Sequence, residues 1–172
     1  MKKLLFFMMC SLLAIGFAGC SDEEESEKIV VNYQLLNEAG VECYDFREGE
    51  NIIFKLEIKN NTDEDVIFPP ISEIIGSNIF HVYTRNEKDM GMPWDELFSI
   101  LVAHSIIGAH SSTELICPWF DMPSLSTNGH VYSECFIKKS KKSALPKGEY
   151  YSKFDIKLDS KTITCNRTFK IR

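Results

Sequence analysis

The cysteines are the residues of this chain whose chemistry depends most on spacing. Four of them follow the first 27 residues, at Cys43, Cys117, Cys135 and Cys165. No two have the C-x-x-C spacing of a zinc knuckle or a thioredoxin-like redox site. An even number of cysteines in an oxidising compartment favours disulfides. The alternative is a set of buried free thiols, which pack like small hydrophobic residues.

A specific pairing follows from the strand pattern. The segments around Cys117 and Cys135 each alternate like a strand, and the loop between them is centred near residue 126. A hairpin with that centre places Cys117 opposite Cys135, which leaves Cys43 to pair with Cys165. On the chain-entropy model each bridge would add about 3–5 kcal/mol to stability.

No arrangement typical of an enzyme or a metal site is present in the sequence. The four histidines lack the H-E-x-x-H and H-x-H spacings, and no serine lies in a G-x-S-x-G elbow. The acids Asp63–Asp65 lack the glycine and the terminal glutamate of a calcium loop. We therefore expect a protein that is not an enzyme and that uses no metal or cofactor.

Aromatic side chains are the best candidates for a binding surface. Four candidates lie in the middle of the chain, at Trp94, Trp119, Phe120 and Met122. If they are exposed, such residues would be contact anchors for a protein or glycan ligand. If they are buried, they belong to the core, where most aromatic residues lie.

The elements that must position these residues alternate with the two-residue period of a strand. Ile52–Lys59 is the clearest case, with isoleucine, phenylalanine and leucine on one face and charged residues on the other. Further strands are expected at Val30–Leu36, Val41–Phe46, Val66–Phe68, Asn78–Thr84, residues 113–119 and 131–137, Tyr150–Leu158 and Thr162–Ile171. Many short strands with turn signals between them predict an all-β fold, an immunoglobulin-like antiparallel β-sandwich.

One segment departs from this pattern. Between Pro93 and His110, apolar residues recur at spacings of three and four, beginning with Trp94. This spacing predicts a short helix inserted between strands. We find no internal repeat and no second domain, so residues 28–172 are expected to form a single domain.

The beginning of the chain resembles a bacterial lipoprotein signal. Lys2 and Lys3 precede an apolar run that is shorter than the roughly 20 residues needed to span a bilayer. The run ends in Phe17-Ala-Gly-Cys20, which resembles a lipobox with phenylalanine in place of the usual aliphatic residue. The resemblance implies that residues 1–19 are removed and that Cys20 carries a covalent lipid that anchors the protein to a membrane. The alternative is a plain secretory signal with an incidental cysteine.

Residues 20–27 are expected to form an acidic tether. Five of the seven residues in Ser21–Glu27 are Asp or Glu, and such a run cannot pack into a core. It resembles the acidic export signal of surface lipoproteins in certain Gram-negative anaerobes. That resemblance implies an outer-membrane lipoprotein exposed on the cell surface. The alternative is a solvated spacer on a lipoprotein that faces the periplasm.

The charge of the domain argues against a nucleic-acid partner. Residues 28–172 carry 17 basic and 20 acidic side chains, which gives a net charge of −3. Nucleic-acid binding needs clustered positive charge. The one basic cluster, Lys138–Lys142, is interpreted as a solvated loop tip.

Two segments of the domain resemble a known family. Phe46–Val66 looks like the second-strand region of BsuPI-type immunoglobulin-like domains, which are named after an intracellular proteinase inhibitor. Leu145–Tyr150 resembles the entry to their penultimate strand. The resemblance implies the sandwich fold and suggests proteinase inhibition as one activity. No residue of this chain can be assigned to a reactive loop.

Together these observations favour a lipid-anchored, extracytoplasmic, non-catalytic binding or adhesion module that acts through loops at one end of the sandwich. Two alternatives belong to other classes. One is a proteinase inhibitor, and the other is a structural accessory subunit of a cell-envelope assembly.

Overall fold

The computed structural model describes residues 28–68, 78–93, 105–120, 141, 143–158 and 161–172, and these residues form strands, turns and loops without a helix. The strands are β1 (Ile29–Leu36), β2 (Asp45–Phe46), β3 (Ile53–Asn60), β4 (Val66–Phe68), β5 (Val82–Thr84), β6 (Asp89–Gly91), β7 (Ser105–Ile107), β8 (Ser112–Pro118), β9 (Gly148–Leu158) and β10 (Lys161–Ile171).

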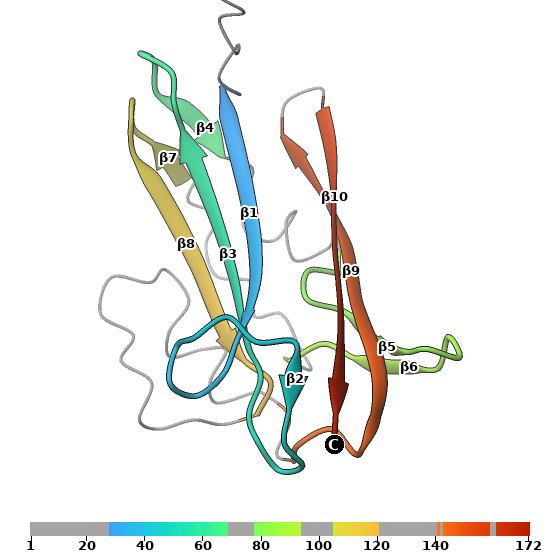
Figure 1. Cartoon of the computed structure of the whole chain (residues 1–172). Coiled ribbons are helices and arrows are strands. Elements are labelled where there is room, and N and C mark those ends of the chain that lie inside the picture. Colours follow the sequence, from blue (N-terminus) through green and yellow to red (C-terminus); the bar gives the residue numbers. More distant parts are fainter. Residues whose placement is uncertain (1–27, 69–77, 94–104, 121–140, 142, 159–160) are drawn as a thin grey trace, which may run out of the picture.

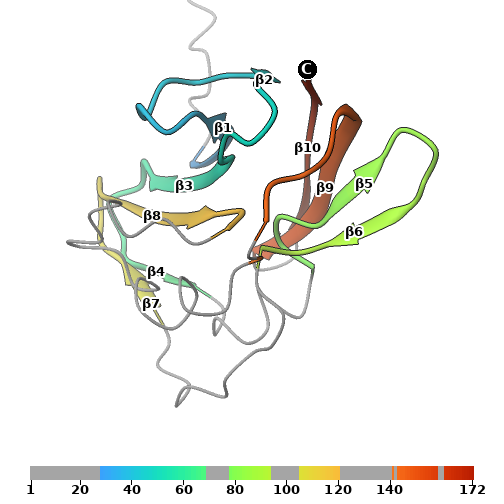
Figure 2. The same cartoon turned by 90° about the horizontal axis from the view of Figure 1, so that it is seen from below.

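The strands form two facing sheets and a small ribbon. The first sheet has the order β1-β3-β8, and the second has the order β2-β10-β9-β5-β6. Figures 1 and 2 show these sheets as two layers, while β4 and β7 pair at the end of the molecule where β1 begins. Apart from the parallel pair of β2 and β10, all pairings between the described strands are antiparallel. The predicted antiparallel sandwich is confirmed, and its sheet order matches that of an immunoglobulin-like fold.

The alternation in the sequence explains which faces are buried. In β3, Phe54, Leu56 and Ile58 are buried, while Lys55 and Lys59 lie on the opposite face. Strand β9 follows the same rule, because Tyr150, Ser152, Phe154 and Ile156 point inward. Each fully buried large apolar side chain contributes about 1.5–3 kcal/mol to stability.

An aromatic cluster fills the space between the two sheets. Phe80 stacks on Phe54 from the first sheet, with ring centroids 5.3 Å apart. It also meets the edge of Phe154 from the second sheet at 5.5 Å. Tyr33 of β1 completes the cluster, with its ring 4.8 Å from that of Phe154.

A tyrosine corner fixes the entry to β9. The Tyr150 hydroxyl donates a hydrogen bond of 2.6 Å to the carbonyl oxygen of Pro146, four residues upstream. This local bond at the start of a strand is a recurrent feature of immunoglobulin-like sandwiches. It anchors the strand whose outer face carries the candidate site described below.

Several expected elements differ in the structure. The strand expected over Asn78–Thr84 begins only at Val82, because Asn78 and Phe80 have φ angles of 61° and 62° that interrupt an extended chain. The strand expected over Val41–Phe46 is reduced to β2 and an isolated bridge at Glu42.

The segment Pro93–His110, in which a short helix is expected, contains a strand near its end. Ser105–Ile107 form strand β7, because their β-branched pair aligns with β4 in an antiparallel ribbon. Residues 94–104 of that expected helix lie outside the described residues. The strand expected at 131–137 also lies outside them.

Candidate functional site

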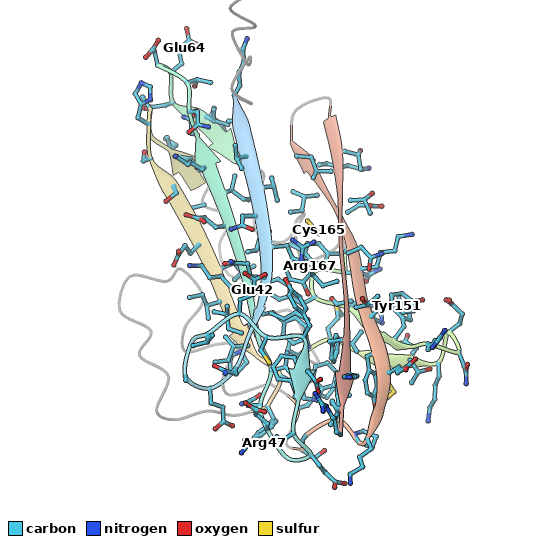
Figure 3. All side chains as sticks on the ribbon, in the orientation of Figure 1. Glu42, Arg47, Glu64, Tyr151, Cys165 and Arg167 are labelled. Carbon is cyan, nitrogen blue, oxygen red and sulfur yellow. The ribbon has the colours of Figure 1, made fainter. Side chains whose placement is uncertain are left out.

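The outer face of the five-stranded sheet carries an ordered set of aromatic and polar side chains. Tyr83 of β5 pairs with Tyr151 of β9, and Tyr151 pairs with Thr168 of β10. Directly paired residues point to the same side of a sheet. Because Val82 and Ser152 are buried on the inner side, this row faces outward. Figure 3 shows Tyr151 on the side of β9 that faces away from the first sheet.

Three aromatic rings stack on this face. The His81 and Tyr83 rings have centroids 4.5 Å apart, and those of Tyr83 and Tyr151 are 5.2 Å apart. The turn from β5 to β6 supplies a carboxylate to each end of the stack. Asp89 lies 2.6 Å from His81 Nε2, and Glu87 accepts a 2.6 Å hydrogen bond from the Tyr151 hydroxyl. The stack is therefore held in place before any ligand arrives.

These contacts shift the pKa values of the groups involved. The hydrogen bond to Glu87 raises the pKa of Tyr151 to about 12. The hydrogen bond from His81, together with that from the Gly91 amide, lowers the pKa of Asp89. At neutral pH the site therefore presents the neutral hydroxyl of Tyr151 and the ionised carboxylate of Asp89.

A groove of about 460 Å³ lies next to the stack. Its lining residues are Tyr44, Arg85, Glu149, Tyr150, Tyr151, Thr168, Phe169 and Lys170. Tyr83 covers one face of the Tyr151 ring, so the opposite face is turned toward β10 and its small residue Thr168. Tyr44, which immediately precedes β2, bounds the far side, because β2 pairs with the other edge of β10.

The dimensions of the groove suit one six-membered ring. Strands β9 and β2 flank β10, so they are about 10 Å apart. A ring stacked on Tyr151 needs about 3.5–4 Å of separation from it. A single six-membered ring can therefore lie over Thr168 against the free face of Tyr151.

A row of alternating charge forms one end of the groove. The strand register places four charged residues side by side across the sheet, in the order Asp45, Lys170, Glu149 and Arg85. Lys170 Nζ lies 3.2 Å from Asp45, and Arg85 forms an ion pair with Glu149. Asp45 also pairs with Arg172, and this hydrogen bond lowers the pKa of Asp45. The row offers hydrogen-bond donors and acceptors side by side without a strong net charge.

This arrangement suits recognition by contact. Arg85 and Lys170 are engaged in ion pairs and the Tyr151 hydroxyl in a hydrogen bond, so these groups are ordered in advance of a ligand. Among the described residues, no group of three or more His, Cys, Asp or Glu side chains is placed to hold a metal ion.

The predicted binding-surface residues do not form this site. Trp119 is 3% exposed and packs against Phe54, so of the two alternatives open to it, surface anchor or core, it takes the core one. The Trp119 amide donates a hydrogen bond to the Ile52 carbonyl. This bond continues the pairing of β8 with β3 and turns the indole inward. Phe120 is partly buried and packs on the core. Trp94 and Met122 lie outside the described residues, as does the lipidation candidate Cys20.

One of the two predicted disulfides is corrected. Cys43 and Cys165 are free thiols, so the expected bridge between them is not formed. Cys43 Sγ donates to the Asp45 carbonyl at 3.2 Å. Asp45 pairs with Lys170, five residues beyond Cys165 on β10, and this register separates the two thiols. Cys117 points into the core from β8, and Cys135 is not among the described residues.

Reasoning from the sequence missed the residues that line the groove. A usable signal was present in β9, where strict alternation places either Tyr150 or Tyr151 on the solvent face. A contiguous exposed patch marks a contact surface, so an outward aromatic residue of β9 is informative only together with a neighbour such as Tyr83. The contributions of Tyr44 and Arg85 come from long-range pairing, which no local pattern indicates.

The comparisons with family models and with curated proteins identified no relative of this chain. No family model matches the chain, and no curated protein matches it. In the part of the chain that the structure describes, no helix has the length and apolar character needed to cross a membrane.

Proposed function

We propose that this protein is a non-catalytic, lipid-anchored binding module that takes a sugar ring of a glycan in the groove beside Tyr151. The observation that carries the proposal is that Tyr151, stacked on Tyr83, lines the groove together with its strand partner Thr168, next to a row of paired charges. Sugar rings have apolar C–H faces that pack on aromatic rings and hydroxyls that need both donors and acceptors. The groove offers both kinds of contact.

The preformed stack supports a binding role. Tyr151 is fixed by Tyr83 on one side and by Glu87 at its hydroxyl, so little conformational entropy is lost when a ligand packs against it. A rigid aromatic side chain is an efficient contact anchor for this reason.

The location belongs to the same proposal. The resemblance of Phe17–Cys20 to a lipobox supports an anchor at the outer membrane, and the acidic residues up to Glu27 support exposure on the cell surface. A lipoprotein that faces the periplasm is the alternative. In either location the module would meet polymers outside the cytoplasm.

Binding can be tested with the full lipidated chain in detergent micelles on an array of mammalian and plant glycans. The decisive variant is T168W, which fills the groove and should reduce binding to any retained glycan by at least about tenfold. The matched control is T164W, which adds the same side chain to the same face of β10, four residues away. Equal binding by wild type and T168W, or no binding to any glycan, would contradict the proposal.

A second pair of variants separates the ring from its hydroxyl. Y151A removes the stacking face and should weaken binding as T168W does. Y151F keeps the face and loses the hydrogen bond to Glu87, so it should retain most of the binding. If no glycan binds, stoichiometric inhibition of a protease panel or co-purification with envelope proteins would favour the inhibitor or the accessory subunit instead.

A further inference from the structure

Two isoleucines stand exposed at one end of the molecule. Ile67 of β4 and Ile106 of β7 are 64% and 65% exposed, and they pair directly across the ribbon. Paired side chains on one face form a continuous apolar surface. We call Ile67 and Ile106 the isoleucine pair.

The ribbon is held rigidly by a buried amide. Asn60 is fully buried, and its Nδ2 donates to the carbonyl oxygens of Glu64 and Ile107 at 2.8 and 3.1 Å. These bonds fix the Glu64 carbonyl just before β4 and the Ile107 carbonyl within β7. The exposure of the isoleucine pair is therefore a fixed feature of the ribbon.

The isoleucine pair lies where the tether joins the domain. A groove of about 680 Å³ is lined by Lys28, Ile29, residues 62–66 and Ile67. Lys28 is the first described residue, and its carbonyl accepts a hydrogen bond from Asn61 at 2.8 Å. Figure 1 shows β4, β7 and the beginning of β1 at the same end of the sandwich.

The length of the tether sets how far this end can be from the anchor. Residues 20–27 span at most about 28 Å when fully extended. If Cys20 carries the lipid, Ile67 stays within a few tens of ångströms of the bilayer. Such confinement raises the effective concentration of a weakly binding surface near its target.

We infer that the isoleucine pair rests on the lipid surface and orients the domain on the membrane. This inference relies on the proposed lipid anchor at Cys20. Two of the nearby acids have local partners, because Asp63 lies 2.8 Å from His110 Nε2 and Asp65 accepts a hydrogen bond from the Ala109 amide at 3.0 Å. Glu64 stays exposed, so the contact suits zwitterionic headgroups better than anionic ones.

The test uses the full lipidated chain reconstituted into phosphatidylcholine vesicles. A bimane fluorophore is attached to I67C, and separately to I106C, in a C43S/C135S background, which removes the partly exposed thiol of Cys43 and the cysteine that lies outside the described residues. The control is R47C, at the opposite end of the sandwich from Glu64 (Figure 3). Brominated acyl chains should quench most of the fluorescence of the I67C and I106C labels, and aqueous iodide should quench the R47C label instead.

The outcomes separate the inference from the anchor on which it relies. Flotation with the vesicles but equal iodide quenching at all three positions would overturn the inference and leave the anchor standing. Failure to float would overturn both. A third outcome is that the labels are shielded from iodide only at high protein density and are not quenched by brominated lipid. This outcome would identify a second copy as the occupant and would overturn the lipid contact.

Discussion

The Tyr33 hydroxyl donates a hydrogen bond of 2.8 Å to Ser152 Oγ, and this bond joins the two sheets through the core. The two residues are 119 positions apart and are 2% and 0% exposed. Burial raises the pKa of Tyr33, so the phenol stays neutral and remains a donor. A buried polar pair of this kind stabilises the fold only while both partners are present.

The first prediction concerns this pair. Y33F and S152A should each lower the free energy of unfolding by about 1–3 kcal/mol, because each leaves one buried hydroxyl without its partner. The double variant should be less destabilised than the sum of the two, since neither hydroxyl then remains. Urea unfolding of the four proteins measures this coupling. Strict additivity would show that the bond contributes nothing specific.

The second prediction concerns pH. The folded pKa of Tyr151 is about 12, above the usual value near 10. A raised folded pKa contributes stability that is complete below about pH 10 and is lost as the pH rises through about 12. Because the Glu87 hydrogen bond is the largest cause, E87Q should move the Tyr151 pKa back toward 10. NMR titration of the labelled tyrosine ring carbons would measure this shift, and E149Q is the control. An unchanged pKa in E87Q would mean that the bond is absent in solution.

The third prediction concerns the thiols. Burial raises the pKa of both Cys117 and Cys165, the latter to about 11, and a protonated buried thiol is a poor nucleophile. Iodoacetamide should therefore modify Cys43 first and should reach Cys117 and Cys165 only after unfolding. Peptide mapping without reductant checks this expectation. A linked peptide that contains Cys43 and Cys165 would show that the protein forms the bridge that the structure lacks.

The fourth prediction concerns location. Protease treatment of intact cells should remove the domain while a periplasmic control protein survives, if the acidic run after Cys20 directs surface exposure. The variant C20S should lose membrane attachment, which separates anchoring from export. Survival of the domain until the outer membrane is opened would assign it to the periplasm and would make the acids a spacer.

Local patterns predicted most of the sandwich but little of the groove. The alternation correctly assigned the buried face of β3 and predicted β9 as a half-buried strand without deciding which of its faces is buried. The pairing of Tyr151 with Thr168 follows from the turn expected after Leu158, which sets the register of β9 and β10. The approach of Arg85 and Tyr44 from other strands depends on long-range contacts that alternation does not encode.

Two outcomes that local patterns left undecided have a common physical cause. Trp119 was open to either a surface or a core position, and Ser105–Ile107 lie in the segment in which a short helix was expected. Pairing with distant strands decided both, since the amide of Trp119 bonds to Ile52 and β7 pairs with β4. Tertiary pairing overrides local preference where a strand edge is available.

The position of β1 has a mechanical consequence. The proposed tether enters at Lys28, directly before β1, and the groove lies on the other sheet. A ligand pulled by flow would transmit tension from the membrane along the axis of β1. That strand is paired with β3 over all eight of its residues, so such tension loads the whole ladder in shear. Bonds loaded together in shear resist more force than bonds opened one at a time, so the β1–β3 ladder would resist such tension as a unit.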